Sequence, residues 1–444
     1  MKIAILYFFT LLSTVIFAQN KYEKARELFD GYFNNSNKVG IEEIEQEIIS
    51  LAPNSEFAMY IRASWLAEDS LCKEALFLTD SLVSHFPDFM PGYFAQGSIL
   101  NNCKSDFENA KYYFSKCIEL NPDFAGSYRN LGITYFNLDL FEQADSLFRK
   151  CLAIDANDTV CMQYYGINLF LIDNVGKAYE VLKKIKEETV YISDYYYYLG
   201  WCEMELELYP DALMSFSLGI EAEPEDAEML TGRGWAQMYL GNDKSALYDF
   251  NQALVLDSTS AEAHLGIGLV YYYMKSYSRS VIELDKAIAL DKENSEPWFY
   301  KGSAFYEQKM YKEAVAAFTK SIELDLEDAY SYFFRGVSSN LWKGEEMYQS
   351  IFEDFEMAVK LKNADAESYY QLALIAFNQY SVYEISIKAV TIAIEIDPDD
   401  SRFYFLRGLI YELDGNTELA CREWKKASEM GDKKAAKELK RICQ

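Results

Sequence analysis

Histidine and proline are the scarce residue types in this chain. Its 444 residues include only eight prolines and two histidines, His85 and His264, which lie 179 positions apart. Histidine supplies many zinc ligands and much of the general acid–base catalysis in proteins. A histidine-based metal cluster and repeated histidine-assisted catalysis are therefore disfavoured, and we predict no bound metal and no cofactor.

Familiar catalytic motifs are also missing. The sequence has no Gly-x4-Gly-Lys-Ser/Thr phosphate loop, no His-Glu-x2-His pair and no Gly-x-Ser-x-Gly elbow. Gly266-Ile267-Gly268 resembles half of a dinucleotide fingerprint, but it lies in an expected helix with no strand before it. We therefore predict that the protein is not an enzyme.

Positive charge is in deficit. The chain has 70 acidic and 42 basic side chains, which gives a net charge of −28. Such a surface repels a phosphate backbone over a Debye length, so nucleic acid is excluded as a partner. Half of the residues are apolar, which is too many for a disordered chain.

Long apolar runs are confined to the first twenty residues. Lys2 is followed by a mostly apolar stretch, Ile3 to Phe17, which breaks at Ala18. Fifteen helical residues rise about 22 Å, which is short of the roughly 30 Å hydrocarbon core of a membrane. This layout predicts a cleaved signal peptide over residues 1–18 and a periplasmic or secreted protein; an uncleaved membrane anchor is the alternative. No later stretch has 18 consecutive apolar residues, so no transmembrane segment is expected in the mature chain.

What is abundant is a repeat of 34 residues. It is marked by seven glycines in phase: Gly132, Gly166, Gly200, Gly234, Gly268, Gly302 and Gly336. Small residues recur twelve positions after the first six of these glycines, and large residues, Phe or Leu, recur sixteen positions after the same six. Apolar spacings of three and four predict two amphipathic helices per repeat. The small residues allow the two helices to approach closely while the large ones fill the space between them.

About twelve repeats fit the chain. They open near Tyr22, Glu56, Met90, Ala125, Thr159, Ser193, Ala227, Ala261, Ser295, Ala329, Ala366 and Ser401. The first lacks the glycine and alanine columns, the tenth carries about three extra residues near Trp342-Lys343-Gly344, and the eleventh has Ala373 in place of glycine. Residues 432–444 read as one more helix, which suits the polar cap that a repeat array needs.

The pattern resembles the tetratricopeptide repeat family over nearly the whole mature chain. Tyr128-Leu131-Gly132-Tyr135-Ala144-Phe148 shows the signature well. The resemblance implies an all-α, right-handed α-solenoid of about twelve helix-turn-helix units with a C-terminal capping helix. We divide the chain into degenerate N-terminal units (19–89), a regular superhelix (90–431) and the cap (432–444).

A second stripe on each first helix is rich in aromatic residues. In the five units built on Gly200 to Gly336, aromatics fill nine of twenty such positions, or 45%, against 16% of the chain. They are Tyr197, Trp201, Trp235, Tyr239, Tyr272, Tyr273, Phe299, Tyr306 and Phe333, and Tyr370, Phe377 and Phe405 extend the pattern.

In tetratricopeptide proteins the equivalent stripe lines a concave groove that binds extended peptides. The resemblance therefore implies a protein-interaction scaffold, and the expected signal peptide predicts that it acts in the cell envelope. The stripe has no Lys or Arg but contains Glu205 and Glu307, which favours a protein or peptide partner with apolar anchors and basic flanks. Two alternatives stay open: the rings pack against the next repeat, or they stack on sugars in a glycan or cell-wall binding module.

The eight cysteines include three pairs placed symmetrically about predicted turns: Cys421 with Cys443, Cys72 with Cys103, and Cys151 with Cys161. Antiparallel helices bring such positions side by side, so these pairs are disulfide candidates; burial as free thiols is the alternative.

The last 24 residues, 421–444, carry eight basic and four acidic side chains. Solvated capping explains this charge, and a docking patch for an acidic partner is the other interpretation.

Overall fold

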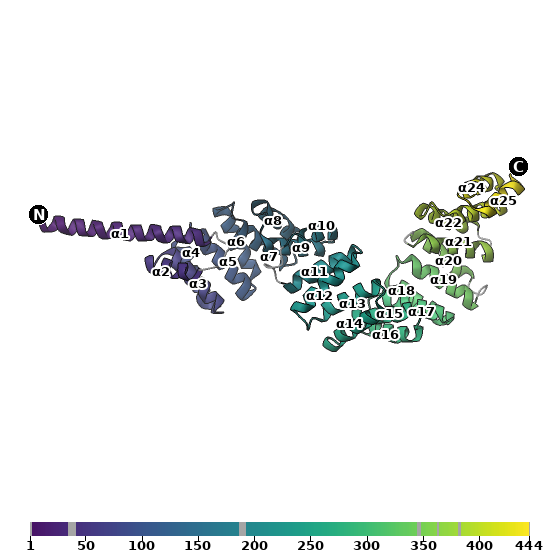
Figure 1. Ribbon diagram of the computed structural model, residues 1–444, viewed down its shortest axis with the longest axis horizontal. Coiled ribbons are helices and arrows are strands. Elements are labelled where there is room, and N and C mark those ends of the chain that lie inside the picture. The colour runs from purple at the N-terminus through teal and green to yellow at the C-terminus, as the bar shows by residue number, and fades with distance from the viewer. Residues whose placement is uncertain are drawn as a thin grey trace. The chain divides into compact units, whose positions relative to one another are not determined.

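The computed structural model describes residues 2–33, 41–185, 192–343, 348–361, 364–380 and 383–443. These residues form 25 helices and no strand (Figure 1). Successive helices pack in pairs, α1 with α2, α3 with α4, and so on to α23 with α24, and α25 follows the last pair. The prediction of an all-helical array of about twelve helix pairs with a terminal helix is confirmed.

The chain forms two compact units, Met1–Ala222 and Glu223–Gln444. The first contains α1 (Lys2–Phe33), α2 (Ile41–Leu51), α3 (Glu56–Glu68), α4 (Cys72–His85), α5 (Met90–Lys104), α6 (Phe107–Leu120), α7 (Ala125–Phe136), α8 (Phe141–Ile154), α9 (Thr159–Leu171), α10 (Val175–Leu182), α11 (Ile192–Glu205) and α12 (Tyr209–Ala222).

The second unit contains α13 (Ala227–Tyr239), α14 (Asp243–Leu256), α15 (Ala261–Tyr273), α16 (Tyr277–Leu290), α17 (Glu296–Glu307), α18 (Tyr311–Leu324), α19 (Ala329–Lys343), α20 (Tyr348–Leu361), α21 (Ala366–Tyr380), α22 (Tyr383–Ile396), α23 (Ser401–Leu413), α24 (Thr417–Glu429) and α25 (Lys433–Ile442). The predicted division at residues 89 and 90 stays a prediction.

The repeat glycines set the approach of the two helices in a pair. A Cβ atom added to Gly234 would lie 2.8 Å from the ring of Phe250, and one added to Gly132 would lie 2.7 Å from Phe148. Both rings are fully buried. The space that a side chain needs is therefore filled by the large residue sixteen positions later, as the two columns predict.

The tenth repeat keeps this contact in a shifted register. Gly336 faces the ring of Phe355, which lies nineteen residues later instead of sixteen. The three additional residues agree with the insertion expected near Trp342-Lys343-Gly344. Gly344 itself lies outside the described residues, as do Met1 and Gln444 at the ends of the predicted segments.

The N-terminal helix runs without interruption through the predicted cleavage position, since α1 extends from Lys2 to Phe33. In the part of the chain that the structure describes, no helix combines the length and the apolar character that crossing a membrane requires. The signal peptide and the exported location stay predictions.

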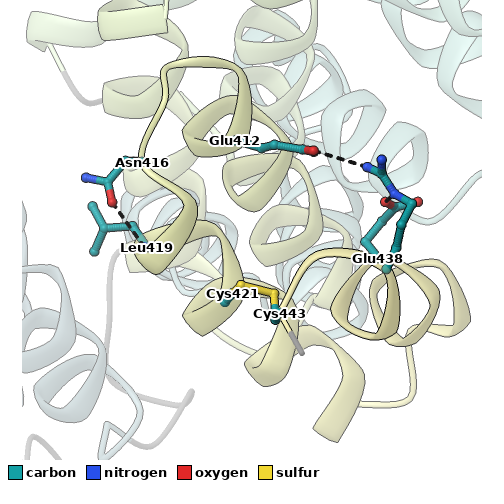
Figure 2. The surroundings of a disulfide bond; sticks show 7 residues. Glu412, Asn416, Leu419, Cys421, Glu438 and Cys443 are labelled. Atoms are coloured by element: carbon teal, nitrogen blue, oxygen red, sulfur yellow. Dashed lines mark hydrogen bonds and ion pairs between the residues drawn. A yellow bond between two sulfur atoms is a disulfide. The ribbon is translucent and has the colours of Figure 1, made fainter.

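Two of the three candidate cysteine pairs are disulfides. Cys72 and Cys103 join α4 to α5 with their Cα atoms 5.9 Å apart. Cys421 and Cys443 join α24 to the residue after α25 with a Cα separation of 5.7 Å (Figure 2).

The third predicted pair is wrong, because Cys151 and Cys161 are buried free thiols. Each has its own acceptor: Cys151 Sγ donates to Asp158 Oδ2 at 3.7 Å, and Cys161 Sγ donates to the Phe148 carbonyl at 3.6 Å. Thiol packing, the alternative interpretation, holds for this pair.

Candidate partner-binding surface

Four tyrosines of the second unit form an aromatic surface on the first helices of consecutive repeats. Tyr239 ends α13 and is 54% exposed, and Tyr273 ends α15 and is 55% exposed. Tyr272 and Tyr300 beside them are half-buried. The hydroxyls of Tyr273 and Tyr300 lie 3.5 Å apart, and the ring centroids of Tyr272 and Tyr300 are separated by 5.7 Å. We call Tyr239, Tyr272, Tyr273 and Tyr300 the tyrosine surface.

The repeat geometry separates this surface from the rings beneath it. Aromatic residues one position after the repeat glycine, or three positions before it, pack on the large residue of their own second helix. Trp235 lies 5.4 Å from Phe250, and Phe299 lies 5.8 Å from Phe318, measured between ring centroids. Position five after the glycine lies away from this contact, so Tyr239 and Tyr273 reach solvent, whereas Met238 at position four is buried.

Two predicted contact residues therefore need correction. Trp235 is only 8% exposed and Phe333 only 6%, so both belong to the core. The cause is close packing on the second helices: Trp235 contacts Phe250, and Phe333 lies 6.4 Å from Phe355 between ring centroids.

The remaining predicted residues are half-buried. In the second unit they are Phe299, Tyr306, Tyr370 and Phe377. Tyr370 and Phe377 each have a local partner: the Arg402 guanidinium lies 5.1 Å from the Tyr370 ring, and Phe377 lies 6.2 Å from Tyr383. In the first unit Tyr197 and Trp201 are also half-buried, with ring centroids 6.3 Å apart.

Glutamates border the tyrosine surface. Glu262 at the start of α15 accepts a hydrogen bond from Trp235 Nε1 at 3.0 Å. Desolvation by the surrounding side chains raises the pKa of Glu262, and the neighbouring carboxylate of Glu228 raises it further. Desolvation likewise raises the pKa of Glu296, with an added contribution from Glu262. Among the described residues neither Glu262 nor Glu296 forms an ion pair, so this border is an uncompensated negative field.

The tyrosines keep their protons beside these carboxylates. Burial raises the pKa of Tyr272 to about 12, and the charge of Glu307 adds to the shift. Burial and the hydrogen bond with Tyr273 also raise the pKa of Tyr300. The surface therefore offers neutral rings and hydroxyl groups beside carboxylate groups.

Sequence reasoning missed Tyr300 and the glutamate border. Glu228, Glu262 and Glu296 stand six positions before three successive repeat glycines, so a 34-residue periodicity of acidic residues was the available signal. Among the described residues, no group of three or more His, Cys, Asp or Glu side chains is arranged to hold a metal ion.

Comparisons with known proteins point to one family. A family model described as "TPR repeat" matches residues 234–275, and two models described as "Tetratricopeptide repeat" match residues 265–329 and residues 92–124 and 125–158. A TPR repeat-containing protein of Methanocaldococcus jannaschii is 24% identical over 231 residues, covering 49% of this chain and 40% of that protein.

Two further proteins are similar to part of this chain. A UDP-N-acetylglucosamine–peptide N-acetylglucosaminyltransferase of Giardia intestinalis is 39% identical over 75 residues, 16% of this chain and 5% of that protein. The C-terminal part of a TPR repeat-containing protein from Cytophaga hutchinsonii is 18% identical with a TM-score of 0.41, covering 54% of this chain and 97% of that one.

The chain thus spans less than half the length of both curated relatives. The matched segments lie in both units: residues 92–124 and 125–158 each cover one helix pair, and residues 234–275 and 265–329 each begin inside a first helix. The 34-residue glycine column and its buried ring partners are present in these pairs and beyond them. Residues 92–158 and 234–329 are thus tetratricopeptide repeats within a multi-repeat chain.

Proposed function

We propose that this protein is a non-enzymatic scaffold that binds an extended segment of a partner protein on the tyrosine surface. The exposed rings of Tyr239 and Tyr273, one repeat apart, carry the proposal. Aromatic side chains that reach solvent are frequent energetic centres of protein interfaces. The bordering Glu262 and Glu296 favour a segment in which basic residues flank an apolar anchor.

We further propose that the scaffold acts in the cell envelope. The apolar stretch from Ile3 to Phe17 before Ala18 supports export through a cleaved signal peptide. N-terminal sequencing of the protein purified from its native cells tests this part: a mature terminus near Gln19 in the periplasmic or extracellular fraction is expected. An intact Met1 in the cytoplasm contradicts it.

A sugar-stacking module is less well supported than a protein scaffold. Trp201 and Trp235 are the tryptophans that such a role would use, and Trp235 is buried while Trp201 is half-buried. Sugar rings stack on exposed aromatic faces, and on the tyrosine surface the exposed rings are those of Tyr239 and Tyr273.

Partner capture tests the proposed function. The tagged protein is used to isolate its partner from the native envelope, and the partner is identified by mass spectrometry. We expect Tyr239→Ala combined with Tyr273→Ala to weaken binding of that partner by about tenfold or more, the loss typical of central interface residues.

Tyr248→Ala is the matched control. Tyr248 is a 63% exposed tyrosine of the same unit, but it lies on the second helix α14 instead of a first helix. Equal binding by wild type and the Tyr239–Tyr273 variant, or equal losses in that variant and the control, contradicts the proposal.

A further inference from the structure

The terminal helix carries charge of the opposite sign to the rest of the molecule. Lys433, Lys434, Lys437, Lys440 and Arg441 all lie on α25, in a chain whose net charge is −28. The apolar side of α25 is used in packing: Ala435 is buried, and Leu439 and Ile442 pack against the cluster that contains Ala435 and Trp424. The lysines are exposed as a consequence.

A pocket of about 610 Å3 lies where α25 begins, between α21, α23 and α25. Its apolar lining includes Tyr370, Leu374 and Phe405, all half-buried. Its basic lining consists of Arg402, Lys433 and Lys434. A pocket with an apolar floor and a basic rim fits a segment that combines acidic and apolar side chains.

Arg402 is a fixed part of this rim. Its guanidinium donates to Asp400 at 2.6 Å and to Glu367 at 2.9 Å, and it lies 5.1 Å from the ring centroid of Tyr370. These two carboxylates offset its charge, so Arg402 chiefly shapes the pocket.

Lys433 and Lys434 supply the uncompensated charge. Both are exposed, and neither forms an ion pair among the described residues. The one acidic residue of the lining, Asp432, is engaged as the N-cap of α25 and accepts from the backbone N–H groups of Lys434 and Ala435.

The disulfide between Cys421 and Cys443 fixes the helix that carries these lysines. It joins α24 to the far end of α25, and Arg441 of α25 also forms an ion pair with Glu412 of α23 at 3.1 Å (Figure 2). A pocket wall that is held in place before binding loses less conformational entropy when a ligand arrives.

We propose that this pocket binds an acidic segment of a partner protein through one apolar side chain on its floor and carboxylates at Lys433 and Lys434, and that the Cys421–Cys443 disulfide holds the pocket in its binding form. Charge complementarity selects the occupant, because the pocket is basic within an acidic molecule. The site is separate from the tyrosine surface, which favours the opposite charge.

Fluorescence anisotropy with a defined probe tests the proposal. The probe is a fluorescein-labelled peptide of three Asp-Glu-Leu repeats, and a peptide of three Lys-Arg-Leu repeats serves as its charge-reversed counterpart. In the Tyr239–Tyr273 variant, which lacks the proposed site for basic segments, the acidic peptide should bind more tightly than the basic one. Lys433→Glu combined with Lys434→Glu should weaken binding of the acidic peptide by about tenfold or more.

A charge-matched variant separates the pocket from general attraction. Lys437→Glu combined with Lys440→Glu makes the same change of charge on the same helix, but these residues do not line the pocket. It should weaken binding much less. Equal losses in the two variants, or undiminished binding by the Lys433–Lys434 variant, overturns the proposal.

The role of the disulfide needs its own variant. Cys421→Ser combined with Cys443→Ser should lower affinity for the acidic peptide while circular dichroism shows the helix content of wild type. Unchanged affinity overturns this part of the proposal. The wild type could also self-associate through this pocket. If it does, and the Lys433–Lys434 variant does not, the occupant is a second copy of this chain and the assignment to a separate partner is overturned.

Failure here is distinguishable from failure of the proposed function. The Tyr239–Tyr273 variant should bind the acidic peptide like wild type, because neither tyrosine lines the pocket. Loss of the acidic peptide in that variant overturns the claim that the two sites are separate.

Discussion

Glu203 is a carboxyl group that the first unit buries beside a hydroxyl. It lies in α11, is 5% exposed, and accepts a hydrogen bond from Ser215 Oγ of α12 at 2.6 Å. Desolvation raises its pKa from 4.5 to about 7, although the Ser215 hydrogen bond opposes the shift. A neutral Glu203 therefore suits the folded chain better than an ionised one.

The raised pKa makes stability depend on pH. The folded state keeps its proton up to about pH 7 while the unfolded chain loses it near pH 4.5, so the free energy of unfolding should fall across this interval. We predict that Glu203→Gln stabilises the protein by about 3 kcal/mol at pH 8 and has little effect at pH 4.5. Urea denaturation of wild type and variant at both pH values measures the difference.

Glu205→Gln is the control, since Glu205 is exposed on the same helix. It should change stability little at either pH. A Glu203→Gln variant that is equally stable to wild type at pH 8 would show that Glu203 is ionised in the folded protein at no cost.

The individual residues also show where sequence reasoning reached its limit. The packing of the repeat glycines could be predicted from the sequence. A Gly followed by a Phe sixteen residues later indicates that the ring fills the space beside the glycine when the two helices pair. The aromatic stripe did not predict exposure. Trp235 and Tyr239 are both large rings in the same helical stripe, and only contact with Phe250 places the first in the core.

At the scale of the helix pair, the turn between the two helices has a feature that the sequence hides. The residue seven positions after the repeat glycine has positive φ in successive repeats: it is Gly241 (75°), Lys275 (59°) and Lys309 (60°). The following N–H closes the helix end, as Asn242 N does on the Gln237 carbonyl at 2.9 Å. The turn requires positive φ at this position whichever residue occupies it. The position therefore shows no constant residue type, and the sequence alone does not reveal it.

This conformation gives an opposed pair of predictions. Lys309→Gly should stabilise the protein by about 1 kcal/mol, because glycine adopts positive φ without the penalty of a Cβ atom. Gly241→Ala should destabilise it by a similar amount, since no atom lies within 4 Å of the added methyl and the backbone alone sets the cost. Chemical denaturation measures both; effects of the same sign in the two variants would refute the explanation.

Ion pairs between the helices of a pair are a second hidden column. Arg233 of α13 donates from Nε to Asp249 of α14 at 2.8 Å, and Arg407 of α23 donates to Glu423 of α24 at 2.7 Å. Each arginine directly precedes a repeat glycine, and each acid lies sixteen residues after the arginine. The spacing was present in the sequence, but a charge pair at sixteen residues acquires meaning only when the helix pairing is known.

At the scale of the whole molecule, the net charge of −28 acts against folding. Like charges repel in the compact state more than in the expanded chain. Ion pairs on the surface act in the opposite direction, but exposed pairs such as Lys24–Glu47 contribute little. Repulsion among the 28 unbalanced negative charges should therefore dominate the salt dependence of stability.

Raising the ionic strength should accordingly stabilise this protein. Between 0.01 and 0.15 M the Debye length falls from about 30 to about 8 Å, which screens repulsion between distant charges first. We predict that Tm at pH 8 rises by roughly 2–4 °C over this range, as an increase of about 1 kcal/mol in unfolding free energy produces in domains of 150–250 residues. Thermal unfolding followed by circular dichroism in sodium chloride measures it, and sucrose of equal osmolality controls for solute effects.

At pH 5, nearer the isoelectric point of about 4.5, the salt effect should shrink because fewer charges are unbalanced. A Tm that falls with salt at pH 8 would mean that ion pairs such as Arg233–Asp249 and Arg407–Glu423 outweigh the repulsion, and the array would then be held together by its charges instead of strained by them.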